Sequence, residues 1–173
     1  MIRKLLKTEF HKIYKLMEIS FPKDEYRNYD KQLSLMDNPA YRIYVMPDME
    51  TDDIKAFIAV WEFETIVYIE HFAVNPDHRN NGLGSKILCE IIKIVNKTIC
   101  LEVELPENEL AVRRIGFYER NDFCLNNYPY MQPAISDGGK PVPLMIMTHG
   151  KHVDHYNFHK IKTLLYTHVY KQV

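Results

Sequence analysis

The sequence predicts a mixed α/β (α+β) fold, in which helices flank a mostly antiparallel central sheet. Three runs rich in β-branched and aromatic residues follow one another at 41–46, 55–63 and 66–74. Polar turn segments separate these runs, as expected of consecutive antiparallel strands. After residue 74 the pattern changes to alternating helices and strands, which indicates that helices cover the sheet.

Two helices are expected before the first of these strands. Residues 8–20 carry apolar side chains at helical spacing, which predicts a helix with one buried side. Pro22 lies in the segment that breaks this helix, and a short second helix follows near residues 30–36.

The second half of the chain supplies the remaining elements. Residues 85–96 place many apolar side chains on one wide face, which predicts a helix packed on the sheet. If this helix crosses over in the usual right-handed sense, the strand after it pairs parallel with the 66–74 strand. The later elements are expected as a strand at 98–104, a helix at 109–120, a strand at 123–127, a long proline-containing loop and a strand at 144–148.

The chain is expected to form one domain with an added C-terminal helix. A length of 173 residues is sufficient to bury a sizeable core. Residues 1–148 contain the sheet elements. Residues 149–173 carry Phe158, Ile161 and Leu165 at helical spacing, so we expect a helical extension packed on or beside the core.

Composition argues against several kinds of binding surface. The 22 basic and 23 acidic residues give a net charge of −1, and no long block carries a single sign. We therefore expect no nucleic-acid partner and no membrane partner. The N-terminal charges are too closely spaced for a signal-peptide core, and no apolar run approaches the ~18 residues of a membrane span. These features indicate a cytoplasmic protein.

Neither the cysteines nor the histidines have a convincing metal-ligand pattern. The three cysteines lie in apolar helix or strand patterns, so we expect them to be buried as small hydrophobic residues. Several histidines gather near the C-terminus, and His155 and His159 share a helical face, as some zinc ligands do. Only Asp154 would complete such a set, so we expect a surface helix and no bound metal.

Residues 79–84, Arg-Asn-Asn-Gly-Leu-Gly, predict an anion site between the 66–74 strand and the following helix. A helix N-terminus presents unpaired amides and a partial positive charge, so a tight turn into it makes a phosphate cradle. Gly82 and Gly84 let a phosphate approach these amides, and Gly82 tolerates a positive φ. The Walker pattern and the Rossmann fingerprint are both excluded, the latter because Ile87 stands at the third glycine position.

A second motif lies at residues 113–123, Arg-Arg-Ile-Gly-Phe-Tyr-Glu-Arg-Asn-Asp-Phe. With residues 70–76, which lead like a bulged strand into residues 79–84, it resembles the GNAT superfamily of acyl-CoA-dependent N-acetyltransferases. The resemblance covers residues 1–148 and is strongest over residues 66–123. It implies the GNAT fold for this chain.

The chain departs from the family pattern in the second motif. Asp122 replaces the usual Gly, and Asp tolerates the left-handed turn better than most residues. Arg114 and Ala111 stand where the family often has Ala and Asn, although Asn108 lies nearby.

The resemblance implies acetyl-CoA as co-substrate and no metal. The amides at the helix start would hold the pyrophosphate, and the strand backbone would pair with the pantetheine arm. Arg79 would contact a phosphate or brace the loop. The implied cofactor-binding residues are Phe72, Ala73, Val74, Arg79, Asn80, Asn81, Gly82, Leu83, Gly84 and Ser85.

The resemblance also implies that Tyr118 protonates the departing thiolate. Glu70 is the expected general base, because an alkylamine is mostly protonated at pH 7 and must lose its proton directly or through water. Glu102, on the next strand, is the reserve candidate. In the alternative interpretation, Tyr118 covers the helix end and Glu70 is a solvated or structurally paired carboxylate.

The sequence therefore predicts an N-acetyltransferase that moves an acetyl group from acetyl-CoA to a primary amine by direct attack in a ternary complex. We expect a small-molecule amine in preference to a protein acceptor, bound by residues 21–29 and 128–133, and a monomer or homodimer. A non-catalytic acyl-CoA-binding or sensing module and a protein-lysine acetyltransferase are the alternatives.

Overall fold

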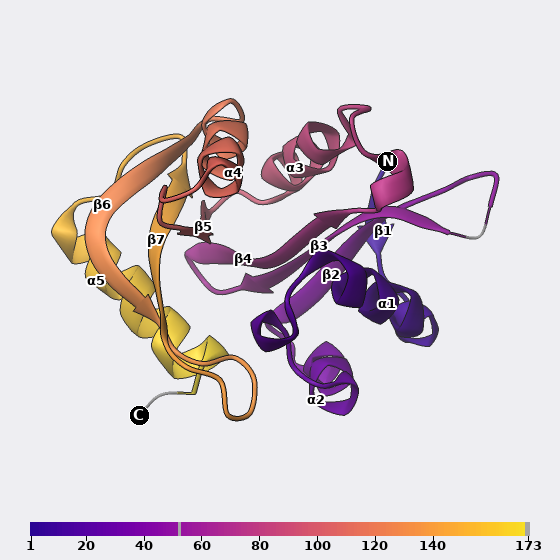
Figure 1. Ribbon diagram of the computed structural model, residues 1–173, viewed down its shortest axis with the longest axis horizontal. Coiled ribbons are helices and arrows are strands. Elements are labelled where there is room, and N and C mark those ends of the chain that lie inside the picture. The colour runs from indigo at the N-terminus through magenta and orange to yellow at the C-terminus, as the bar shows by residue number, and fades with distance from the viewer. Residues whose placement is uncertain (52, 172–173) are drawn as a thin grey trace.

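Seven strands form one sheet in the order β1-β2-β3-β4-β5-β7-β6 in the computed structural model, which describes residues 1–51 and 53–171 (Figure 1). Every neighbouring pair is antiparallel except β4 and β5, so the predicted mixed, mostly antiparallel sheet is confirmed. The strands are β1 (Arg3–Lys4), β2 (Tyr41–Pro47), β3 (Ile54–Glu62), β4 (Ile66–Val74), β5 (Thr98–Glu104), β6 (Phe123–Gln132) and β7 (Val142–His149).

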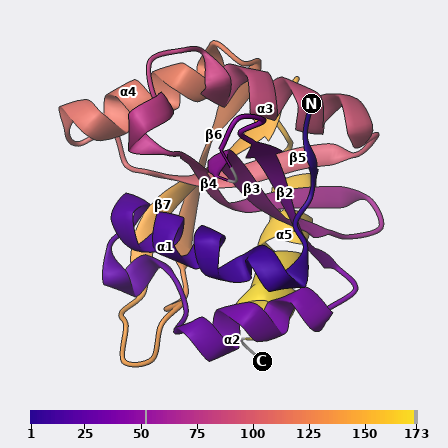
Figure 2. The ribbon, with the colours of Figure 1, turned by 90° about the vertical axis from the view of Figure 1, so that its right-hand side faces the viewer.

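Helices cover both faces of this sheet (Figure 2). Side chains of α3 and α4 form one buried cluster with the sheet, and side chains of α1, α2 and α5 form a second cluster on the opposite face. The α-helices are α1 (Phe10–Ser20), α2 (Tyr29–Ser34), α3 (Leu83–Ile94), α4 (Glu109–Glu119) and α5 (His155–Leu164). Short 3-10 helices lie at Lys7–Glu9, Lys23–Glu25, Leu35–Asp37 and Pro76–His78.

Strand β4 has a bulge on its β3 side and only a short pairing on its β5 side. Toward β3, the pairing passes from Ala59↔His71 to Val60↔Ile69, which leaves Glu70 as an extra, bulged residue. Toward β5, the parallel pairs run only from Ile66↔Thr98 to Ile69↔Leu101. The second half of β4 therefore continues beyond its registered pairing with β5.

Strand β6 is longer than predicted. A strand was expected at 123–127 with a loop from Pro129 onward, but β6 continues to Gln132. The pairing of β6 with β7 is irregular between Asn126 and Tyr130, and Pro129 lies in this irregular stretch. Because β6 is an edge strand, the N–H that Pro129 lacks does not interrupt a central ladder.

The C-terminal helix continues the core on the α1 side of the sheet. It consists of α5 and a π-helical turn, Leu165–Val169. Phe158, Ile161 and Leu165 are buried in the same cluster as the side chains of α1. Asp154 caps the helix by accepting from the amide of Asn157. The division of the chain at residue 148 stays a prediction.

The cysteine prediction is wrong for one of three residues. Cys100 is buried and Cys124 partly buried, but Cys89 is exposed because it lies on the outer side of α3, away from Leu88 and Ile91. Over residues 1–51 and 53–171, none of the helices is both long and apolar enough to cross a membrane.

Candidate active site

The loop between β4 and α3 is held by two left-handed residues. Asn80 has φ 64° and Gly82 has φ 70°. Gly82 is the N-cap of α3, and a Cβ built on it would meet no atom within 4 Å. Glycine is therefore needed at this position for its left-handed backbone conformation and because it leaves the helix N-terminus open, as the sequence predicts.

Gly84 is needed for a different reason. A Cβ on Gly84 would lie 3.3 Å from Cζ of Phe117 and 3.6 Å from Cζ of Phe72. The absent side chain therefore lets the first turn of α3 approach aromatic rings from both α4 and β4.

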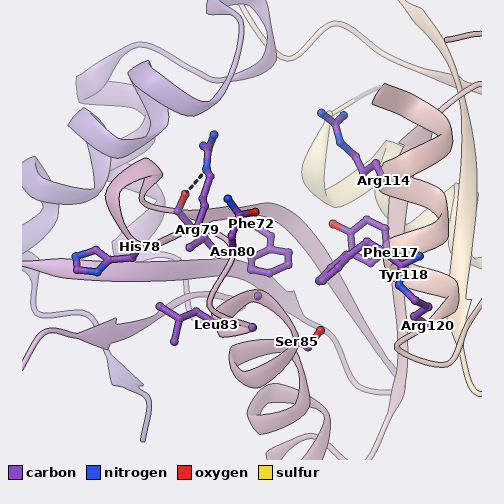
Figure 3. A pocket seen from close by; sticks show the side chains of 13 residues that line it. Phe72, His78, Arg79, Asn80, Leu83, Ser85, Arg114, Phe117, Tyr118 and Arg120 are labelled. Carbon is purple, nitrogen blue, oxygen red and sulfur yellow. Dashed lines mark hydrogen bonds between the residues drawn. The ribbon is translucent and has the colours of Figure 1, made fainter. Parts of the chain in front are cut away.

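These elements enclose a cleft of about 500 Å³ (Figure 3). Three arginines line it, Arg79, Arg114 and Arg120, so the cleft is basic. Its other lining residues are Phe72, Val74, His78, Asn80, Gly82, Leu83, Gly84, Ser85, Phe117 and Tyr118. Among the cofactor-binding and catalytic residues assigned from the sequence, only Ala73, Asn81 and the two glutamates do not line it.

Arg79 braces the loop from inside the cleft. Its Nε donates to the carbonyl oxygen of Val74 at 3.0 Å, drawn as the dashed line in Figure 3. Four lining residues had been assigned no role from the sequence: His78, Arg114, Phe117 and Arg120. His78 directly precedes the first motif, and the other three lie within the second motif, which is the sequence signal that would have found them.

Tyr118 is buried on α4 between the rings of Phe117 and Phe123. Its hydroxyl points from α4 into the cleft (Figure 3). Burial raises the pKa of Tyr118 to about 12, against an opposing effect of the Arg114 charge. The phenol therefore keeps its proton at neutral pH and is available as a donor.

The turn after α4 forms despite the replacement of glycine. Asp122 adopts φ 63°, as expected for a residue that tolerates the left-handed region. Asn108 is the N-cap of α4, where its side chain accepts from the amide of Ala111 at 2.9 Å.

Glu70 is buried at the β4 bulge and paired with Arg27. Its side chain is 1% exposed, and Oε1 accepts from Nη1 of Arg27 at 2.9 Å. Burial alone would raise the pKa of Glu70, but the charge of Arg27 and the contact with His71 outweigh it and lower the pKa to about 2. Glu70 thus has a structural partner, as one of the two sequence interpretations anticipated.

Glu102 is buried on β5 among neutral donors. Oε2 accepts from Tyr68, Gln132 and Tyr170, at 2.8, 2.5 and 2.7 Å, and Oε1 accepts from Tyr130. Burial raises the pKa of Glu102, although these hydrogen bonds oppose the effect.

A second cleft, of about 430 Å³, lies on the α1 and α2 side of the sheet. Residues between 23 and 31 line one wall and residues 135–139 the other. Lys31 binds Asp137 across it at 2.6 Å, and Arg27 is also part of its lining.

Only one of the two segments expected to bind the acceptor lines this second cleft. In the other segment, Tyr128 donates to the carbonyl of Val153 and packs on Phe158, and Tyr130 donates to Glu102. These tyrosines thus connect β6 to α5 and to β5.

Among the described residues, no group of three His, Cys, Asp or Glu side chains is placed to hold a metal ion. His155 and His159, the histidines that share a helical face, are exposed on α5.

The family model described as "Acetyltransferase (GNAT) family" matches residues 5–123. A relative from Bacillus subtilis (strain 168), "Putative acetyltransferase YjbC", is 36% identical over 64 residues, which are 36% of this chain and 33% of that protein. The aligned part is thus about a third of that relative's length.

Two solved structures extend the likeness to the fold. A putative GNAT-family acetyltransferase from Bacteroides thetaiotaomicron is 32% identical, covers 98% of each chain and superposes with a TM-score of 0.87. An aminoglycoside 6'-N-acetyltransferase complexed with coenzyme A is 17% identical, covers 86% of this chain and 95% of that chain, and gives a TM-score of 0.66. Because the family model spans well over half of the sequence and the Bacteroides structure matches almost all of it, this chain belongs to the acetyltransferase (GNAT) family.

Proposed function

We propose that the protein is an N-acetyltransferase that transfers an acetyl group from acetyl-CoA to a primary amine by direct attack in a ternary complex. One observation carries the proposal: the N-terminus of α3 and the hydroxyl of Tyr118 face the same basic cleft. An anion site and a proton donor in one cleft are what a phosphate-bearing thioester substrate requires.

The residues present fit the phosphates of coenzyme A. The left-handed Gly82 leaves the first amides of α3 accessible, and Arg79, Arg114 and Arg120 add positive charge to the same walls. The extended backbone of residues 72–74 continues beyond the registered β4–β5 pairs, so it is the part of the sheet suited to an extended amide-bearing arm.

Tyr118 is proposed as the acid. Acetyl-CoA supplies the activated thioester, and Tyr118 holds a proton for the sulfur that leaves. Donation from a phenol with a pKa of about 12 to a thiolate, whose conjugate acid has a pKa of ~8.5, is unfavourable as an isolated step. The donation must therefore be coupled to the loss of a proton by the amine.

Glu70 is proposed as the carboxylate that accepts the amine's proton, with Glu102 as the alternative. Both are buried and neither lines the basic cleft, so the proton would reach them through another group or through water. Two features favour Glu70: it lies on the β4 bulge, two residues before the cleft-lining Phe72, and Arg27, its partner, lines the second cleft.

We infer that the acceptor is a small amine bound in the second cleft. This cleft is walled by charged side chains of both signs, including Lys31 and Asp137, and Arg27 connects it to Glu70. The structural neighbour named for aminoglycoside N-acetylation is in keeping with a small polyfunctional amine.

A panel of amines tests the proposal. Purified protein is mixed with acetyl-CoA and single amines from the polyamine, aminoglycoside and amino-acid classes, and free thiol is followed together with the mass of the product. Thiol release that depends on one amine supports acetyl transfer. Binding of coenzyme A without turnover of any amine would favour the non-catalytic module, and acetylation restricted to protein lysines in a lysate would favour a protein-lysine acetyltransferase.

A further inference from the structure

Two buried polar atoms face each other beside the bulge in β4. Within the part of the chain that the structure describes, Oε2 of Glu70 and Nδ1 of His71 are buried and have no hydrogen-bond partner. The two atoms lie 3.5 Å apart. Buried polar atoms are seldom left unpaired, so this pair calls for an explanation.

The bulge explains why adjacent residues meet. Neighbouring side chains on a regular strand point to opposite faces of the sheet. Here Glu70 is the extra residue between the pairs Ala59↔His71 and Val60↔Ile69, which breaks that alternation. The carboxylate and the imidazole therefore lie together, on the side of β4 that the α1–α2 connection covers.

A backbone contact fixes which ring nitrogen of His71 carries a proton. Nε2 lies 2.9 Å from the carbonyl oxygen of Glu25, and a carbonyl only accepts, so Nε2 is the donor. Nδ1 then either turns a lone pair toward the carboxylate oxygen or carries a second proton. A proton shared between Nδ1 and Oε2 satisfies both atoms.

Charged and aromatic groups surround this pair of atoms. Arg27 already neutralises Glu70 through Oε1, so adding a proton to His71 makes the three-residue group net positive. Glu25 lies on the other side of the imidazole, and Phe21 packs edge-on against its ring. The phenols of Tyr41, Tyr68 and Tyr170 also feel the charge of Glu70.

We propose that Oε2 of Glu70 and Nδ1 of His71 form a site for a single proton and, resting on the function proposed above, that this site accepts the first proton of the acceptor ammonium. The free amine nitrogen then bonds to the acetyl carbon as the carbon–sulfur bond breaks and its electron pair leaves with sulfur. Tyr118 gives its proton to that sulfur and regains the second proton of the nitrogen. The site releases the first proton to solvent afterwards.

The proton site is tested without any substrate, by following the ring nitrogens of ¹⁵N-labelled histidines from pH 5 to 9. His71→Gln identifies the signals of His71. In Glu70→Gln, the midpoint at which Nδ1 of His71 is protonated should fall by about one pH unit or more, because the anion beside it is gone. The midpoint of His159, exposed on α5, should not move.

Two results would overturn the proton site. One is an Nδ1 that stays unprotonated across this whole range in the wild type, and the other is a midpoint that Glu70→Gln leaves unchanged. If Glu70→Gln does not fold, Arg27→Met provides the opposite test: removing the cation should raise the midpoint, and a lowered or unchanged midpoint would refute the pairing.

Kinetics test the role of the site in transfer. In His71→Gln, kcat/KM for the amine should fall about 10²-fold near neutral pH. The defect should shrink as pH rises and the amine loses its proton to solvent, while KM for acetyl-CoA stays within twofold. His159→Gln is the matched control and should behave as wild type. A His71→Gln enzyme with the wild-type pH profile would refute the role, whereas a wild type that acetylates no amine would refute the proposed function and leave the ring titration to decide the proton site.

Discussion

The hydroxyl of Tyr170 lies 2.7 Å from Oε2 of Glu102, although 68 positions separate the two residues in the chain. Val169 precedes Tyr170 in the chain, and its carbonyl oxygen accepts from Arg27, which is ion-paired with Glu70. The C-terminal segment therefore contacts the surroundings of both buried carboxylates. One of these carboxylates faces neutral donors and the other faces a cation, so their effects on stability should depend on pH in opposite directions.

Glu70→Gln should destabilise the protein far more at neutral pH than in acid. The pKa of Glu70 is lowered from 4.5 to about 2 on folding, so its stabilising effect is complete above pH 4.5 and is lost as the pH falls toward 2. Urea unfolding should show a cost of roughly 3 kcal/mol at pH 7 from this linkage, and a smaller cost at pH 3. A cost that is the same at both pH values would contradict the lowered pKa.

Glu102→Gln should show the reverse trend. Its pKa is raised on folding, so the wild type loses stability as the pH rises from 4.5 through the folded pKa. Gln does not titrate, so the variant lacks this pH-dependent contribution at every pH. The loss of unfolding free energy relative to wild type should therefore be largest at pH 4 and should decrease toward pH 8. Unfolding in urea at these two pH values checks the sign, and a cost that grows with pH would show that Glu102 is stabilised as an anion.

Gly82→Asp should abolish the heat stabilisation that coenzyme A gives the wild type. The new carboxylate would stand at the proposed phosphate site of the cleft, and a ligand stabilises only the state that it binds. Gly150→Asp is the matched control. Gly150 has φ 82° and, like Gly82, no atom within 4 Å of a built Cβ, but it does not line the cleft. Thermal melts with and without coenzyme A would contradict the assignment if both variants kept the shift.

Tyr118→Phe should lower kcat about 10²–10⁴-fold and leave coenzyme A affinity nearly intact, because only the hydroxyl is removed. Tyr44→Phe is the control: it removes another buried hydroxyl, which donates to Glu62 at 2.7 Å outside the cleft, and kcat should stay within about twofold. Single-turnover rates isolate the chemical step. A full rate in Tyr118→Phe would make this tyrosine structural.

Asp137→Asn should change KM for the amine several-fold without changing KM for acetyl-CoA. It breaks the 2.6 Å pair with Lys31 that crosses the second cleft. Asp37→Asn breaks a comparable exposed pair with Lys7, at 2.5 Å, outside both clefts and should leave both constants unchanged. If the two variants gave the same amine KM, the second cleft would not be the acceptor site.

The strands that position the cleft were predictable because their local signals agree with their burial. β4 and β5 begin and end at the predicted residues, since both are apolar runs bounded by turn residues. β1 was missed because a two-residue strand carries no periodicity. The predicted β6 ended too early because Pro129 was taken to end the strand. An edge strand can contain proline, since the missing N–H does not interrupt a central ladder.

The cleft itself could be outlined from the sequence, but the partners of the carboxylates could not. Its loop, helix start and Tyr118 belong to two local motifs. The contacts of Glu70 with Arg27 and of Glu102 with Tyr170 join positions 43 and 68 residues apart, and no local pattern encodes them. His71 was given no role from the sequence, and its contact with Glu70 depends on the bulge, which brings the two neighbouring side chains together.

The short parallel pairing of β4 with β5 has a mechanical consequence. The strand pairing between β1–β4 and the rest of the sheet runs only from Ile66↔Thr98 to Ile69↔Leu101. The two parts of the sheet are therefore joined by a short stretch of backbone pairing. An extended ligand bound along residues 72–74 would add contacts between the two parts of the sheet, β1–β4 and β5–β7–β6, and would hold them together more firmly. Amides of β4 beyond Ile69 should therefore exchange with deuterium more slowly when coenzyme A is present, while those within the paired stretch should change little.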